Sequence, residues 1–240
     1  MALTLAGRWA VITGATSGIG AAIARALARE ACNLFLLGRD LPKLHALAAE
    51  FSAVQVNISV VDLADAESVE NCAKHLAGFL EVDVLVHSAG CIYLGTVETT
   101  PDEELDRQYA VNVKAPWKLT KALLPLLKRS HGQIVFINSS AALGSARAQL
   151  ASYAASKSAL KAVADSLREE VNKDGIRVIS IFPGRTATPM QADIYLHEGR
   201  RYRPEELLQP ENVAQSVVRA LLLPATAEVT EISILPMSRG

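Results

Sequence analysis

The chain has 240 residues, of which 50% are hydrophobic and 20% charged, so it can bury a large globular core. Its 24 Lys and Arg residues nearly balance 25 Asp and Glu residues, and no block of like charges suggests a nucleic-acid arm. No apolar run reaches membrane-spanning length. Neither nucleic acid nor a membrane is therefore an expected partner.

The beginning of the chain, residues 1–7, lacks the charged region and apolar stretch of a secretory signal, which favours a cytoplasmic location. Three cysteines, Cys32, Cys72 and Cys91, are widely separated and show no metal-ligand spacing. We expect them to be reduced and structural, and we predict no metal site. No repeat or linker divides the sequence, which predicts one domain over residues 1–240.

Short apolar runs alternate with segments of helical spacing along the chain. The predicted strands are 9–13, 33–37, 54–58, 82–87, 133–138, 177–182 and 228–235. The predicted helices are 19–29, 41–51, 66–79, 103–128, 154–172 and 212–223. This order predicts an α/β fold, a single-domain Rossmann-type doubly wound parallel sheet of about seven strands with helices on both faces. Ligands of such folds bind at the carboxyl ends of the strands.

The first predicted strand runs directly into a glycine-rich turn, and a helical pattern follows at once. Glycines permit the tight turn and the close approach of a pyrophosphate, while the helix N-terminus offers free N–H groups and a positive dipole end. In this strand–turn–helix context the turn predicts a dinucleotide site. Its expected contacts are Gly14, Thr16, Ser17, Gly18, Ile19 and Gly20.

The second predicted strand leads into Gly38, Arg39 and Asp40. An NAD enzyme would place a carboxylate there to hold the ribose hydroxyls. The guanidinium of Arg39 instead suits a 2′-phosphate, which predicts NADP(H) as the cofactor. The alternative is a solvated surface arginine. Asp40 precedes Leu41 and Pro42, a pattern typical of a helix N-cap that faces away from the ribose.

Tyr153 and Lys157 are four residues apart in a helical segment, so they lie on one helical face. A nearby Lys⁺ favours the ionised phenol and lowers its pKa, which makes Tyr153 a candidate general acid/base. Surface packing is the ordinary alternative for such a pair.

Two further polar positions accompany this pair. The fifth predicted strand ends at Asn138, Ser139 and Ser140, and a serine hydroxyl there can bond a substrate carbonyl oxygen or simply cap a turn. Asn112 lies within a long helical pattern although it is a poor helix former. A functional role, a local kink and a bland structural role all remain open for it.

The sequence resembles the short-chain dehydrogenase/reductase family, and the resemblance covers nearly the whole chain. The motifs that carry it occur in the family's order: the glycine motif at 13–20, Asp62-Leu63, His87-Ser88-Ala89-Gly90, Asn112, Ser140, Tyr153-x-x-x-Lys157 and Pro183-Gly184 through Thr188. Several independent motifs at compatible spacing make coincidence an inadequate explanation.

The resemblance implies a role for each matching residue. Tyr153 would exchange a proton with the substrate oxygen, and Lys157 would lower the tyrosine pKa and hold the nicotinamide ribose. Ser140 would position the oxygen, and it is preferred to Ser139 because the family's serine lies thirteen residues before its tyrosine. Asn112 would anchor a water in a proton relay to Lys157. The remaining expected cofactor contacts are Asp62, Leu63, Ser88, Ala89, Gly90, Pro183, Gly184, Thr186 and Thr188.

The sequence also departs from the family's pattern. The usual Asn-Asn is replaced by His87 and Ser88, and we expect His87 to be a structural residue at the strand end rather than a base. Thr186 stands where an aliphatic residue is common beside the nicotinamide. The terminus lacks the Gly-Gly ending of tetrameric relatives, so a homodimer through the two long helices is the default expectation and a homotetramer the other.

Substrate choice is assigned to the segment 189–204, which contains His197, Arg200, Arg201, Tyr202 and Arg203. It could form a cationic lid over an acidic substrate, but a solvated loop is the preferred interpretation. The favoured function is an NADP(H)-dependent oxidoreductase that interconverts a carbonyl and an alcohol. The alternatives are a catalytically idle NADP(H)-binding regulator, which would be expected to have lost Tyr153 or Lys157, and a sugar epimerase, which the glycine spacing and the short carboxyl-terminal part disfavour.

Overall fold

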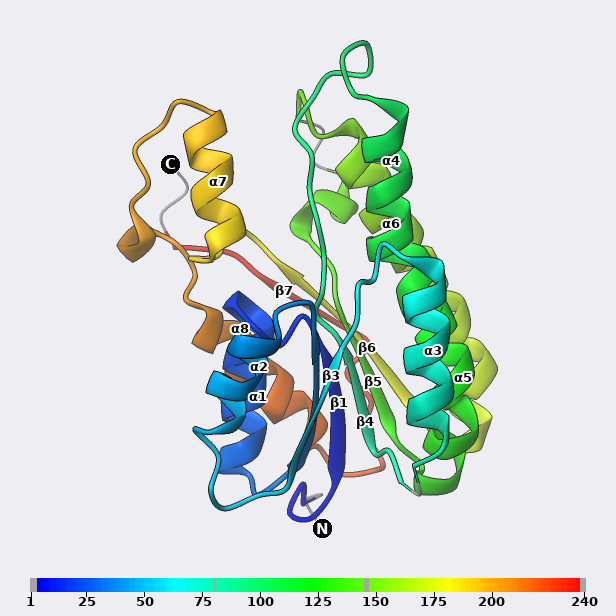
Figure 1. Ribbon diagram of the computed structural model, residues 1–240. Coiled ribbons are helices and arrows are strands. Elements are labelled where there is room, and N and C mark those ends of the chain that lie inside the picture. Colours follow the sequence, from blue (N-terminus) through cyan, green and yellow to red (C-terminus); the bar gives the residue numbers. More distant parts are fainter. Residues whose placement is uncertain (1–3, 80, 145–146, 238–240) are drawn as a thin grey trace.

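The computed structural model describes residues 4–79, 81–144 and 147–237. Seven parallel strands form one sheet in the order β3-β2-β1-β4-β5-β6-β7 (Figure 1). They are β1 (Trp9–Thr13), β2 (Asn33–Gly38), β3 (Val56–Val60), β4 (Val84–His87), β5 (Gln133–Ile137), β6 (Arg177–Pro183) and β7 (Glu231–Ile234). The strand order reverses between β1 and β4, which confirms the predicted doubly wound, Rossmann-type α/β fold.

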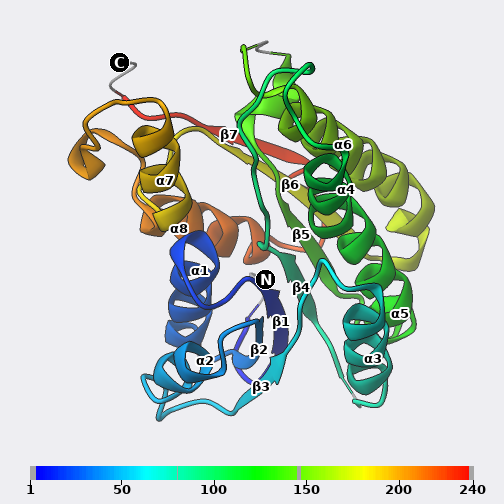
Figure 2. The same cartoon turned by 45° about the horizontal axis from the view of Figure 1, so that its top comes forward.

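Helices cover both faces of the sheet (Figures 1 and 2). One face carries α1 (Gly18–Arg29), α2 (Leu41–Ala48) and α8 (Pro210–Leu221). The other carries α3 (Ala66–Ala77), α5 (Ala115–Ser130) and α6 (Ala151–Val171). Strands read as continuous apolar runs because both of their faces are buried: in β1, Ala10 and Ile12 belong to one core cluster and Val11 to the other.

Two segments differ from the sequence-based expectation. The long helix predicted over 103–128 is three elements: α4 (Asp102–Tyr109), a π-helical turn (Ala110–Lys114) and α5. The segment 189–204, expected as a loop, begins with a helix, α7 (Pro189–His197). Thr188 caps α7 by accepting from the Gln191 N–H at 3.2 Å, and a proline at the first helical position favours the start.

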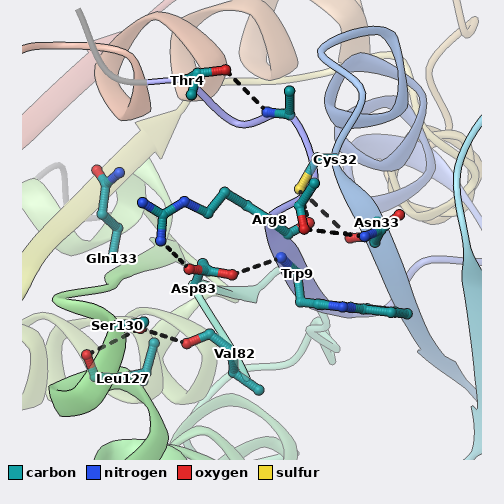
Figure 3. Close-up of polar contacts among 12 residues, drawn as sticks. Thr4, Arg8, Trp9, Cys32, Asn33, Val82, Asp83, Leu127, Ser130 and Gln133 are labelled. Carbon is teal, nitrogen blue, oxygen red and sulfur yellow. Dashed lines mark hydrogen bonds and ion pairs between the residues drawn. The ribbon is translucent and has the colours of Figure 1, made fainter. Parts of the chain in front are cut away.

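A buried carboxylate aligns the central strands at the amino edge of the sheet (Figure 3). Asp83 precedes β4 and accepts hydrogen bonds from the Arg8 guanidinium at 2.5 Å and from the Trp9 N–H at 2.8 Å. At the opposite edge the Thr13 hydroxyl accepts from the N–H groups of Ser88 and Ala89, each at 3.1 Å. These contacts fix the ends of β1 and β4 between which the strand order reverses.

Within the described ranges, no helix combines the length and the apolar character needed to cross a bilayer.

Candidate active site

A cavity of about 350 Å³ opens at the carboxyl edge of the sheet. The elements α4 and α7 stand on opposite sides above this edge (Figure 1). Every predicted site residue except Asn112 lines the cavity: Gly14, Thr16, Ser17, Gly18, Ile19, Gly20, Arg39, Asp62, Leu63, Ser88, Ala89, Gly90, Ser140, Tyr153, Lys157, Pro183, Gly184, Thr186 and Thr188. The structure therefore brings together motifs that are far apart in the sequence.

The glycine-rich turn is held against the neighbouring strands so closely that side chains do not fit. A Cβ on Gly14 would lie 2.8 Å from the Ala89 Cα, and one on Gly18 would lie 2.9 Å from the Thr188 Cγ2. Both glycines have positive φ, +66° and +52°. Ser17 caps α1 without a side-chain hydrogen bond, so the first N–H groups of the helix stay available for an anion.

The glycine-rich turn and the start of α1 together form what we call the glycine cradle, and a buried hydroxyl lies beside it. Ser88 lines the cavity, and its buried Oγ has no hydrogen-bond partner within the described part of the chain. A buried polar atom without a partner is costly unless a ligand or water satisfies it. The turn, the helix end and this hydroxyl fit a dinucleotide phosphate.

The end of β2 supplies a free cation. Arg39 is exposed, lines the cavity and takes part in none of the ion pairs found among the described residues. The neighbouring carboxylate of Asp40 is engaged elsewhere, because it accepts from the Lys43 N–H at 3.0 Å and pairs with the Lys43 ammonium at 3.1 Å. The N-cap prediction for Asp40 is thus confirmed.

The departure from the family at His87 lies behind the cavity rather than in it. His87 is buried, its Nε2 lies 2.8 Å from the Thr120 hydroxyl, and its ring stacks on Phe136. Burial lowers the pKa of His87 to about 3, so the imidazole is neutral at physiological pH. This geometry agrees with a structural role for the residue.

Tyr153 and Lys157 face the cavity from the first turns of α6. The Lys157 ammonium lies 6.0 Å from the centre of the Tyr153 ring and donates to the Ile137 carbonyl at 3.0 Å. Burial lowers the pKa of Lys157 to about 8. Burial also raises the pKa of Tyr153, although a hydrogen bond with the Ser139 side chain opposes this shift.

The expected lowering of the Tyr153 pKa by Lys157 is therefore wrong for this structure. Desolvation of the phenol outweighs the favourable groups around it, and the lysine charge is itself destabilised by burial. At neutral pH the tyrosine is protonated, the form required of a proton donor.

The two serines after β5 both reach the site, and one of them contacts Tyr153. Both line the cavity, and Ser140 begins a short 3₁₀ turn (Ser140–Leu143). The side chain that bonds to Tyr153 is that of Ser139, whose Oγ also accepts from the Ala141 N–H at 3.2 Å. The role of Ser140 toward a substrate oxygen stays a prediction.

Asn112 is fully buried within the π-helical turn and lies outside the cavity lining. Its side chain accepts from the Cys91 N–H at 2.9 Å and donates to the Cys91 carbonyl at 2.9 Å and to the Ser156 Oγ at 3.0 Å. Ser156 in turn donates to the Tyr153 carbonyl at 2.8 Å. Asn112 thus joins the cavity wall at Cys91 to the helix that carries Tyr153. Both of its amide N–H groups are engaged within the protein, and its expected role toward a relay water stays a prediction.

The cationic part of segment 189–204 does not line the cavity. Arg200 and Arg185 flank the Tyr195 ring, each 5.0 Å from its centre, and both pair with Glu198. Arg203 pairs with Glu206 at 2.8 Å. These contacts hold the end of α7 against the segment after β6. Since Arg200, Arg201 and Arg203 all lie outside the cavity lining, the cationic lid considered from the sequence is not formed.

Several cavity residues carry no motif and were missed from the sequence: Ile92, Arg107, Val111, Arg147, Leu150, Arg185, Met190, Gln191 and Ile194. Only those on α7 had a usable signal, because Thr188-Pro189 marks a helix start and the spacing of Met190, Gln191 and Ile194 follows one face. The others are brought in by α4, by loops and by the π-helical turn.

Comparisons with known proteins agree with this geometry. The short chain dehydrogenase family model matches residues 8–199. The oxidoreductase UcpA of Salmonella typhimurium is 35% identical over 237 residues, covering 96% of this chain and 86% of that protein. An uncharacterized oxidoreductase of Staphylococcus epidermidis is 32% identical over 230 residues, covering 95% and 96%.

Solved structures of the same fold include dinucleotide complexes. An alcohol dehydrogenase from Thermococcus sibiricus, complexed with 5-hydroxy-NADP, has a TM-score of 0.86 at 32% identity and covers 97% of this chain and 98% of its own. An actinorhodin polyketide ketoreductase with NADPH has a TM-score of 0.86 at 27% identity and covers 96% of each chain. The matched model, the relatives and the sheet order agree: the chain belongs to the short chain dehydrogenase family.

Proposed function

We propose that this oxidoreductase interconverts a carbonyl and an alcohol with NADP(H), and that Tyr153 is its general acid/base. The observation that supports the proposal is the meeting of Tyr153, Ser139 and Lys157 in the cavity that also contains the glycine cradle. A bound nicotinamide supplies or accepts the hydride. The protein supplies the proton, at the Tyr153 hydroxyl, and a polar wall for the substrate oxygen.

Tyr153 carries the proton that the reductive direction requires. Its ordinary pKa already lies well above neutral pH and burial raises it further, so the phenol can donate a proton to the oxygen of a carbonyl. Ser139 holds the hydroxyl by a hydrogen bond, and Ser140 is proposed to bond the same substrate oxygen.

We propose NADP(H) rather than NAD(H) because of the charges at the end of β2. Arg39 is free to meet a 2′-phosphate, whereas Asp40 is engaged with Lys43 and the Asp62 carboxylate accepts from the Ala64 N–H at 2.9 Å. The 5-hydroxy-NADP and NADPH complexes of similar structures support this choice.

The second candidate is a catalytically idle NADP(H)-binding protein on the same fold. Replacing Tyr153 by Phe distinguishes the two, because it removes only the hydroxyl. We expect turnover of NADPH with ketones and aldehydes to fall by at least about a hundredfold, while NADPH binding followed by nicotinamide fluorescence is retained. Tyr93→Phe is the matched control, since Tyr93 does not line the cavity.

Retained turnover in the Tyr153→Phe variant would assign the proton to another group. Tight NADPH binding with no turnover by the unaltered protein over a broad carbonyl panel would favour the idle binding protein.

A further inference from the structure

The substrate end of the cavity carries two arginines that the proposed proton transfer does not use. Arg107 on α4 and Arg147, just before α6, both line the cavity. Arg107 lies four residues before Val111, and Arg147 lies three before Leu150 and six before Tyr153. Both arginines are also exposed residues.

The charge of these two arginines is poorly compensated. Arg107 lies 3.8 Å from Glu104, and their side chains are 48% and 31% exposed, a geometry in which an ion pair contributes little. No carboxylate among the described residues lies within ion-pair distance of Arg147. The other lining carboxylates are Asp62, which follows β3, and Glu198, which is paired with Arg185.

The cavity that these arginines and Tyr153 share is also lined by apolar side chains: Ile92, Val111, Leu150, Met190 and Ile194. Such a lining suits the hydrocarbon part of a small ligand, and the few polar groups around it set the ligand's orientation. A guanidinium fork matches a carboxylate in two parallel hydrogen bonds.

We propose that the carbonyl substrate is an oxo acid, whose carboxylate binds Arg107 and Arg147 and whose apolar segment lies between that carboxylate and the reacting carbonyl. The proposal rests on the proposed oxidoreductase function and adds the substrate class. In the reaction the carbonyl is reduced to an alcohol while NADPH is oxidised, and the carboxylate is unchanged.

The test compares acids with their own esters. NADPH oxidation is followed with 4-oxopentanoate and 4-oxo-4-phenylbutanoate, in both of which two methylene groups separate the carboxylate from the carbonyl, and with the methyl ester of each. We expect kcat/KM for at least one acid to exceed that for its ester by about tenfold or more, because charge-assisted hydrogen bonds to the carboxylate are lost in the ester.

Variants of the two arginines test whether they cause the preference for acids over esters. Arg107→Ala and Arg147→Ala should each raise KM for the acid with little change in kcat, and the double variant should abolish the preference for acid over ester. Arg201→Ala is the matched control, because Arg201 is an exposed cation of the segment 189–204 that does not line the cavity. The preference of the Arg201→Ala variant for acid over ester should equal that of the unaltered protein.

A binding measurement separates this inference from the proposed chemistry. Calorimetric titration of the Tyr153→Phe protein, saturated with NADPH, should detect binding of the same acids. This binding should be absent when Arg107→Ala and Arg147→Ala are added to the Tyr153→Phe protein. Equal kcat/KM for acids and esters, or equal losses for both in the arginine variants, would refute the oxo-acid class and leave the reductase standing. Absence of carboxylate binding would also refute it, whether or not turnover is found.

Discussion

Arg39 is the residue on which the proposed cofactor preference depends. Replacing it by Asp removes the guanidinium and places a carboxylate where ribose hydroxyls can be bonded. We expect the ratio of NADPH to NADH affinity to fall by at least about tenfold, measured by fluorescence titration with each cofactor. Arg29→Asp, at the exposed end of α1, is the control for a change of net charge. An unchanged ratio in Arg39→Asp would show that the preference is decided elsewhere.

Lys157 makes stability depend on pH in an unusual direction. Its pKa is lowered to about 8 by burial, whereas the unfolded chain keeps the ordinary value near 10.5. Between these values the unfolded state binds the proton and the folded state does not, so stability rises with pH. Relative to Lys157→Met, the wild-type free energy of unfolding should increase by up to about 3 kcal/mol from pH 7.5 to 10.5. Urea denaturation of both proteins across this range measures the difference.

Lys161, one turn further along α6, provides the opposite case. Its hydrogen bonds with Asp165 and Glu231 raise its pKa, so its contribution is present below the ordinary value and is lost as pH rises through the raised value. The pH dependence of Lys161→Met relative to wild type should therefore have the opposite sign. If the stability difference between the wild type and Lys157→Met also fell as the pH rises, the conclusion that burial lowers the pKa of Lys157 would be contradicted.

At the scale of elements, the hydrogen bonds of Asn112 stabilise the π-helical turn between α4 and α5. Leucine at this position would remove three hydrogen bonds and leave the backbone groups of Cys91 and the Ser156 hydroxyl without their partner. We expect Asn112→Leu to lower the free energy of unfolding by about 2 to 4 kcal/mol, measured by urea denaturation. Asn71→Leu, on the exposed side of α3, should stay within about 0.5 kcal/mol of wild type. Equal stability of both variants would mean that the turn does not depend on the amide.

The same turn explains a limit of sequence-based reasoning. Helical periodicity continues through residues 103–128, and a single π-helical turn shifts the pattern by about one residue, which a periodicity argument does not resolve. The poor helix propensity of Asn112 was the available signal, but it left a functional role, a local kink and a bland structural role open. Likewise, Thr188 followed by Pro189 is a pattern typical of a helix start, and α7 begins there, inside a segment interpreted as a loop.

At the scale of the molecule, an exposed apolar side chain offers a test of assembly. We propose a homodimer or homotetramer that uses the long helices, and Trp117 on α5 is 57% exposed. Buried aromatic residues contribute strongly to interfaces, so Trp117→Glu should shift the protein to monomer in size-exclusion chromatography with light scattering. Leu41→Glu, on α2 at the other face of the sheet, should leave the mass unchanged. A monomeric wild type would refute the assembly itself.

The order of strands and the motif residues of the cavity could be predicted, because short apolar runs and glycine turns act locally. Ser139, Arg107 and Arg147 could not be assigned their places, since their neighbours come from distant parts of the chain. The pKa of Tyr153 was misjudged for the same reason: helical spacing revealed the nearby lysine but not the burial that outweighs it.

The glycine cradle has a consequence for how the chain acquires its function. Gly14 touches Ala89, and Gly18 touches Thr188, so the phosphate site requires segments about 75 and 170 residues apart to be in place. A growing chain on the ribosome cannot form this site until residue 188 has emerged. Dinucleotide binding therefore stabilises, by mass action, only those states in which these three segments are already in place, so it follows the assembly of the site and does not guide it.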